Sequence, residues 1–137
     1  MSDCTGGHKV MQFDTASQNI VVNTIHLKLD NMAEWTKEEI QAIWEKATPC
    51  PPNDPNVWRK DQCGAWINRD MYGAASQGEA HTSYKWQVDH KKPDSKGGAD
   101  IVSNARPLQW YNNDYRQNGR LIKKITANGT VNIELDT

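Results

Sequence analysis

The sequence predicts a small α+β fold in which helices lie beside short strands and the chain ends in a β-hairpin. Its 137 residues are enough for one ordinary domain with a single core. A helix-start signal at residues 36–39 and an Asn-Gly turn signal at residues 128–129 lie on either side of a strand-like segment at residues 84–88. We therefore expect an N-terminal extension, residues 1–35, that is partly flexible, and one domain over residues 36–137.

The first predicted helix of the domain begins at Thr36. Its hydroxyl can accept a hydrogen bond from the amide of Glu39, whose carboxylate can reach back to Thr36. Apolar side chains then recur at helical spacing, so one face of this helix should pack on the core. These side chains are Ile40, Ile43, Trp44 and Ala47. Upstream, residues 20–29 form a possible strand of the extension.

The middle of the chain alternates between connectors and short elements. Prolines between residues 49 and 55 predict an extended connector, because proline lacks an amide donor and restricts its predecessor. Residues 58–69 fit a short helix or a strand, and the pattern leaves both open. Residues 73–83 are small and polar, which predicts a loop. Large apolar residues alternate with polar ones over residues 84–88, which predicts a half-buried strand.

The last third of the chain begins with a charged loop over residues 91–100 that contains proline and two glycines. A short strand is predicted over residues 105–108, and a helix over residues 110–118 with Gly119 as its C′ residue. Two strands within residues 121–135 then flank Asn128-Gly129, the dipeptide that favours a type I′ hairpin turn.

Composition excludes some classes of protein. The hydrophobic fraction is 36% and no apolar run approaches the roughly 20 residues of a membrane span, so we expect no membrane association. The first residues lack the pattern of a secretory signal, and a cytoplasmic location is the default expectation. The three cysteines are widely spaced and contain no C-x-x-C pair, so reduced thiols without a chemical role are expected.

The net charge of −1 conceals a strong local asymmetry. Residues 85–124 contain nine lysines and arginines against four acidic residues. An anionic partner is therefore expected to bind this segment.

A cluster of chemically useful polar residues lies in the same segment. Asp89 offers a carboxylate oxygen and Asn113 an amide oxygen, which together suit Mg²⁺ or Mn²⁺. His90 can take a proton from water near neutral pH. Adjacent strand residues point to opposite faces, so Asp89 and His90 can serve one phosphate only where the strand ends or twists.

The order of these residues resembles the HNH nuclease motif, which runs as a DH pair, a loop with two glycines, N-x-x-P-L and a closing His or Asn. The matching residues here are Asp89-His90, Ser95-Lys96-Gly97-Gly98, Asn104, Pro107-Leu108 and Asn113. Residues 58–73 also resemble the segment that precedes the motif in a zinc-less bacterial and phage branch of the family. The resemblance covers about residues 40–120.

The resemblance implies a ββα-metal (HNH) finger, with its core over residues 84–119. It implies that His90 is the general base, and that Asp89 and Asn113 hold one divalent cation. Mg²⁺ is the first expectation, and Mn²⁺ or another divalent ion is the alternative. Asn104 would pin the loop and the histidine through bonds from its side chain to the backbone.

The chain departs from the zinc-containing branch, which has two C-x-x-C pairs. Cys63 with Trp66, and Gln109 with Asn112, stand in those places, so no structural zinc is expected. The bulk of Trp66 and Trp110 suggests that aromatic packing replaces it.

The predicted function is a metal-dependent endonuclease that hydrolyses DNA phosphodiester bonds, with RNA as an open alternative substrate. Candidate phosphate contacts are Arg69, Lys91, Arg106 and Arg116, although ion-paired surface arginine is an equally weighted interpretation of the three arginines. Two further functions are compatible with the sequence. One is a catalytically degenerate HNH module that binds nucleic acid or a partner protein, and the other is a nuclease toxin neutralised by an immunity protein. The sequence leaves the oligomeric state open.

Overall fold

The structure, a computed structural model, describes residues 34–93, 97–117 and 119–136. It is a small mixed α/β domain with two α-helices and three small antiparallel sheets in this part of the chain. The possible strand at residues 20–29 and nearly all of the N-terminal extension lie outside the described residues. None of the described helices is long and apolar enough to cross a membrane.

Helix α1, Lys37–Trp44, begins as the capping box predicts. The Thr36 hydroxyl accepts from the Glu39 amide at 3.0 Å, and the Glu39 carboxylate accepts from the Thr36 amide at 3.0 Å. Trp35 and Ile40, at the N′ and N4 positions, both pack against the same core cluster, as in a hydrophobic staple. The helix therefore enters the core at a fixed angle, and its residues Ile43 and Trp44 are fully buried.

The segment that the sequence left open between helix and strand forms strands. They are β2, Trp58–Lys60, and β3, Trp66–Asn68, followed by the 3₁₀ turn η1, Arg69–Met71. The edge strand β1, Thr48–Pro49, pairs with β2 to give the order β1-β2-β3. An edge position tolerates the proline, which has no amide to donate.

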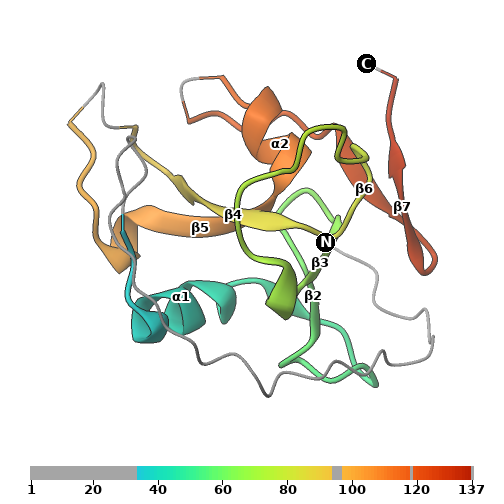
Figure 1. Ribbon diagram of the computed structural model, residues 1–137, viewed down its shortest axis with the longest axis horizontal. Coiled ribbons are helices and arrows are strands. Elements are labelled where there is room, and N and C mark those ends of the chain that lie inside the picture. The colour runs from blue at the N-terminus through green and yellow to red at the C-terminus, as the bar shows by residue number, and fades with distance from the viewer. Residues whose placement is uncertain (1–33, 94–96, 118, 137) are drawn as a thin grey trace.

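The second sheet consists of β4, Trp86–His90, and β5, Ala105–Gln109, paired in antiparallel register from Trp86 with Gln109 to His90 with Ala105. The turn η3, Val102–Asn104, leads into β5. Helix α2, Trp110–Tyr115, follows β5 directly. Figure 1 shows α1 on one side of this sheet and α2 on the other. The two helices therefore cover different faces of the same two strands.

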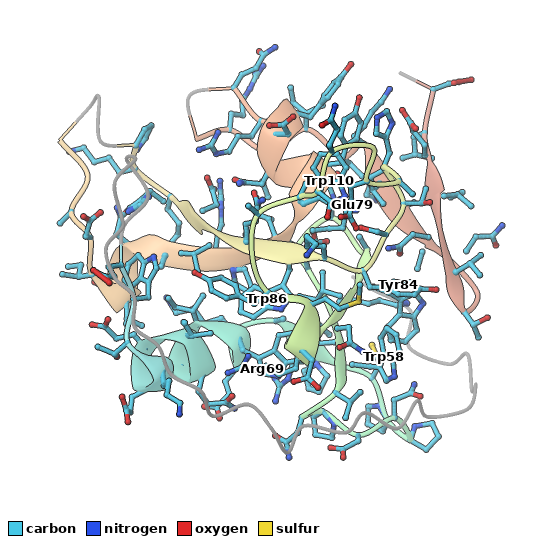
Figure 2. All side chains as sticks on the ribbon, viewed as in Figure 1. Trp58, Arg69, Glu79, Tyr84, Trp86 and Trp110 are labelled. Atoms are coloured by element: carbon cyan, nitrogen blue, oxygen red, sulfur yellow. The ribbon has the colours of Figure 1, made fainter. Side chains whose placement is uncertain are left out.

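The alternation of side chains along β4 follows from this layering. Trp86 packs against Trp44 of α1, with ring centroids 5.3 Å apart, and lies at the centre of the molecule (Figure 2). Val88 packs against the same core cluster. Gln87 and Asp89, on the opposite face, make contacts with residues of the α2 segment.

Helix α2 ends three residues earlier than the sequence predicts. Tyr115 is its last residue, and Arg116 is the C-cap with an extended backbone. Gly119 is therefore not the C′ residue. Its positive φ of 85° instead serves a turn in which Gln117 and Arg120 exchange backbone hydrogen bonds of 2.9 and 3.1 Å.

The C-terminal hairpin is present, with β6, Ile125–Asn128, paired to β7, Val131–Glu134. Asn128 pairs with Val131, so the two loop residues are Gly129 and Thr130 rather than the predicted Asn128-Gly129. Gly129 occupies the first loop position with a φ of 68°, which a residue with a side chain adopts only with strain.

The cysteines differ in state. Cys63 is a buried free thiol, and burial, reinforced by the nearby charge of Asp61, raises its pKa to about 12. Cys50 is disulfide-bonded, so the expectation of reduced thiols is wrong for this residue.

Candidate active site

The carboxylate of Asp89 lies in the face of β4 that α2 covers, and it is fully buried. Arg106 of β5 donates from Nε to Asp89 Oδ2 at 2.7 Å, and Arg116 at the end of α2 donates from Nε to Asp89 Oδ1. Two guanidinium groups thus compensate one buried negative charge. The structure thus brings together Asp89, Arg106 and Arg116, three of the candidate site residues predicted from the sequence.

Asn113 lies on the same face of the sheet. Its Nδ2 donates to Gln87 Oε1 at 2.7 Å, and Gln87 shares a face of β4 with Asp89 because the two are separated by one residue. Asn113 Oδ1 is buried and has no hydrogen-bond partner within the part of the chain that the structure describes. Buried oxygens in proteins are nearly always paired, so this atom is available to accept from water or to bind a ligand.

These observations bear on whether the residues fit a divalent cation. Among the described residues no three His, Cys, Asp or Glu side chains gather into a metal site. The available donors are instead one carboxylate, at Asp89, and the unpartnered amide oxygen of Asn113. Hard oxygen donors of this kind suit Mg²⁺, which commonly takes one or two protein ligands and completes its shell with water and phosphate oxygens. The donor types thus suit a hard cation, while both oxygens of Asp89 are held by arginines in this structure.

His90 is the last residue of β4 and still pairs with Ala105, so the strand does not end or twist before it, and its ring lies near Trp35 on the α1 side, opposite to the Asp89 face. Its Nε2 lies 2.6 Å from Asp100 Oδ1, and its ring centroid lies 5.9 Å from that of Trp35. An ionised carboxylate can only accept, so Nε2 carries a proton in this pair. Asp100 thereby fixes the tautomer of His90, with Nδ1 as the unprotonated nitrogen of the neutral ring.

Asn104 fixes the loop between β4 and β5. Its Oδ1 accepts from the Lys92 amide at 2.9 Å, and its Nδ2 donates to the carbonyls of Lys92 and Ala99 at 3.0 and 2.9 Å. Its own carbonyl accepts from the amide of Lys91, the residue after His90, at 2.8 Å. The side chain of Asn104 thus pins the loop, whereas its link to the segment at His90 runs through its backbone carbonyl and Lys91.

Gly98 explains why the loop closes tightly. A Cβ at this position would lie 1.6 Å from the carbonyl oxygen of Lys92 and 2.9 Å from Asn104 Nδ2. Only a residue without a side chain allows these backbones to approach so closely.

The structure places Arg69 and Lys91 away from Asp89. Arg69 donates from Nε to Gln41 Oε1 at 2.9 Å, and its guanidinium carbon lies 6.0 Å from the ring centre of Trp86 (Figure 2). Burial lowers the pKa of Arg69, as expected for a packed guanidinium. Lys91 is exposed and lines a cavity outside the Asp89 face.

Two residues of the site were not anticipated. Gln87 could have been found from the alternation of β4, because it is two residues before Asp89. Asp100 could not, since a loop has no periodicity that relates its position to that of His90.

A second buried polar cluster includes Gln109 and Asn112, which by the resemblance stand where the zinc-containing branch has cysteines. Asp61 is fully buried and accepts four hydrogen bonds, two of them from Gln109 and Asn112. Burial raises the pKa of Asp61, while these hydrogen bonds oppose the shift. Trp66 is buried and Trp110 is half-buried. The direct link between residues 61–66 and residues 109–112 is made by the hydrogen bonds of Asp61 to Gln109 and Asn112.

Comparison of this chain with known proteins yields no match among family models, curated proteins or solved structures.

Proposed function

We propose that this chain is a metal-dependent endonuclease of the HNH type that hydrolyses DNA phosphodiester bonds, and that β4, the loop, β5 and α2 form its ββα-metal finger. One observation carries the proposal. The unpartnered oxygen of Asn113 belongs to a side chain that is bonded to Gln87, on the face of the sheet that contains Asp89, and His90 ends the same strand. The order of these residues along the chain, with Asn104 holding the loop, supports it.

Each residue then has a distinct role. His90 takes a proton from the attacking water, and Asp100 fixes which ring nitrogen is free to do so. Asn104 keeps the backbone at His90 in place through its bonds to the loop. A divalent cation held by Asp89 and Asn113 would supply charge stabilisation for the scissile phosphate and the departing 3′ oxygen.

The two arginines are compatible with this arrangement. Each oxygen of Asp89 accepts one arginine and retains a lone pair. Arg116 is the more exposed of the two, at 30% against 13% for Arg106, and is therefore better placed to turn toward a bound phosphate.

The direct test is nicking of supercoiled plasmid by the purified chain in Mg²⁺ or Mn²⁺, with EDTA as the metal-free arm and a structured RNA as the alternative substrate. Nicking that requires the metal supports the proposal. Failure to cut either nucleic acid with any divalent ion, by a protein shown to be folded, contradicts it.

Metal binding should also be visible without turnover. We expect Mg²⁺ or Mn²⁺ at ten times its Kd to raise the Tm by about 3–6 °C, since a ligand that binds only the folded state stabilises it. Asn113→Ala should remove this increase, because it deletes the unpartnered oxygen. Asp114→Asn, an exposed neighbour on the same helix, is the matched control and should retain it. Differential scanning fluorimetry measures the Tm of the three proteins with and without metal. If the metal raises the Tm of all three equally, the cation does not bind at Asn113.

Asp100→Asn should lower the single-turnover cleavage rate about 10-fold while leaving the half-saturating DNA concentration unchanged. The reason is that an amide can hold either tautomer of His90, whereas the carboxylate selects one. Asp70→Asn, an exposed carboxylate in η1, serves as control. An unchanged rate would show that Asp100 does not position the base.

The degenerate binding module is the second candidate, and a specific observation favours it. Both oxygens of Asp89 are engaged by arginines, and Nε2 of His90 is engaged by Asp100. Such a module would bind DNA in EDTA without cutting it, and binding would be unaffected by His90→Ala. Electrophoretic mobility shifts measured beside the nicking assay separate the two functions.

A further inference from the structure

A cavity of about 190 Å³ lies outside the Asp89 face and contains an unusual concentration of positive charge. Four of the described residues that line it are cationic, and none of these described residues is acidic. These cations are Lys46, Lys60, Lys91 and Arg106. Neutral polar groups from Thr48 and Gln62 complete the lining, and Ala105 and Pro107 of β5 contribute to its wall.

Three of the cationic side chains, those of Lys46, Lys60 and Arg106, are held by contacts within the domain, whereas Lys91 is exposed. Lys46 Nζ donates to the carbonyl of Ala105 at 2.7 Å and to that of Val102. An ammonium group has three donors, so these two bonds leave one for a ligand. Lys60 is buried, and its Nζ lies 4.8 Å from the ring centre of Trp66. These three charges are therefore preorganised, which lowers the cost of binding an anion.

The proximity of Lys46 and Lys91 is itself unfavourable. Burial lowers the pKa of Lys46, and the positive charge of Lys91 lowers it further. An anion between the two ammonium groups would relieve this repulsion. Repelling cations around a cavity whose described lining includes no carboxylate are typical of an anion site.

The cavity adjoins the proposed active site through two residues. Lys91 directly follows His90, and Arg106 donates to Asp89 from Nε while also lining the cavity. An anion bound here therefore lies next to the proposed catalytic residues. The volume is below the roughly 300–1,000 Å³ typical of pockets for drug-sized ligands, and so favours a single phosphate group over a whole nucleotide.

We propose that this cavity binds a backbone phosphodiester of the nucleic-acid strand, adjacent to the phosphate that is cut. The proposal rests on the proposed nuclease function for its choice of ligand. The cavity would fix the register of the strand through charge and hydrogen bonding, without contact to the bases.

The test uses isotope-labelled protein in EDTA, so that binding is observed without cleavage. The probes are the trinucleotide TpTpT, which contains only internal phosphodiesters, and inorganic phosphate. Binding is followed through the amide signals of Gln62 and Ala105, two lining residues. We expect TpTpT to shift both signals at a lower concentration than inorganic phosphate does.

Variants assign the effect to the cavity. Lys91→Gln should weaken TpTpT binding about 5–10-fold, and Lys46→Gln combined with Lys91→Gln should weaken it further. Lys123→Gln removes an exposed charge from the same basic segment outside the cavity lining, and should leave binding unchanged. Lys60 is left intact because it is buried against Trp66.

The outcomes distinguish this inference from the proposed function. Shifts that disappear in the double variant support the site, and they do so even if no metal ion yields cleavage, in which case only the nuclease proposal falls. Cleavage without shifts at Gln62 and Ala105 overturns the site and leaves the nuclease proposal standing. Tighter binding of inorganic phosphate than of TpTpT overturns the assignment to a strand, since it identifies a site for free phosphate. Equal weakening by Lys123→Gln also overturns it, because general charge would then explain the affinity.

Discussion

His90→Ala should lower the rate of metal-dependent DNA nicking by at least about 100-fold, because a positioned general base contributes roughly 10²–10⁴ to the rate of proton transfer from water. The imidazole lies at the end of β4, 18% exposed, where water can reach it while the strand fixes its backbone. His90 is the one histidine among the described residues between the start of β4 and the end of α2. Single-turnover assays at saturating DNA isolate the chemical step from binding.

The matched control for His90 is His81→Ala. His81 stacks on Tyr111 with ring centroids 3.8 Å apart, and its Nδ1 lies 2.9 Å from Glu134 Oε1. The variant removes a partly exposed imidazole from the same domain and leaves the end of β4 at His90 unchanged. We expect its cleavage rate to remain within about 3-fold of the unmodified chain, on the scale of a surface change.

A second His90 variant separates chemistry from packing. The ring lies beside the partly buried Trp35, which packs against the core, so His90→Ala could also loosen the N-terminal end of α1. His90→Gln keeps much of the volume but supplies no base. Both variants should be inactive and should retain the metal-dependent increase in Tm. Cleavage by either variant at the unmodified rate would remove His90 from the mechanism.

The parts of the fold that sequence predicted well are those set by local interactions. Thr36 and Glu39 are three residues apart, and their reciprocal bonds start α1 without help from the rest of the chain. The strand at β5 and the alternation of β4 likewise follow from nearest neighbours. The candidate site could likewise be proposed from the sequence, because its residues form a pattern of fixed order and spacing along the chain.

The errors lie where distant residues decide the local structure. The Asn128-Gly129 turn was predicted from turn propensity, but Asn132 of β7 exchanges hydrogen bonds with the backbone of Trp66, at 2.7 and 3.0 Å. Those bonds fix β7 against β3 and favour the observed register, in which the loop starts one residue later.

The early end of α2 has a similar cause. Arg116 leaves the helix with an extended backbone and reaches Asp89, a residue 27 positions earlier in the chain. Helix propensity contains no information about this ion pair. Residues 58–69 were undecidable because strands of three residues are too short to show a period.

Asp61→Ala should be the most destabilising single change in the domain, lowering the free energy of unfolding by about 4 kcal/mol or more. Oδ1 of Asp61 accepts from the amides of Cys63 and Ala65, both at 2.9 Å. Oδ2 accepts from the amide of Gln109 at 2.9 Å and from Asn112 Nδ2 at 3.1 Å. Alanine would leave four donors without their acceptor, and each such buried group costs about 1–3 kcal/mol.

The position of Asp61 in the fold increases the effect. It joins the turn between β2 and β3 to the junction of β5 and α2. Asn112 continues the connection, since its Oδ1 accepts from the amides of Lys124 and Ile125 at 3.0 and 2.8 Å. Three segments that are distant in the sequence are thus held by one hydrogen-bonded network. Such a network is strongly coupled, so losing its central acceptor affects every part.

Urea unfolding followed by tryptophan fluorescence measures the loss, with Asp54→Ala as the control. Asp54 also accepts a backbone hydrogen bond, from Asn56 at 2.9 Å, but it is exposed, so water can replace the acceptor. If Asp61→Ala does not fold, Asp61→Asn keeps one acceptor oxygen and turns an NH₂ group toward two of the existing donors. Hydrogen exchange in the native state should then be faster at the amides of Cys63 and Ala65 if the NH₂ group replaces Oδ1. It should be faster at the amide of Gln109 if the NH₂ group replaces Oδ2. An Asp61→Asn protein as stable as the unmodified chain, with unchanged protection at all three amides, would show that the network does not depend on this carboxylate.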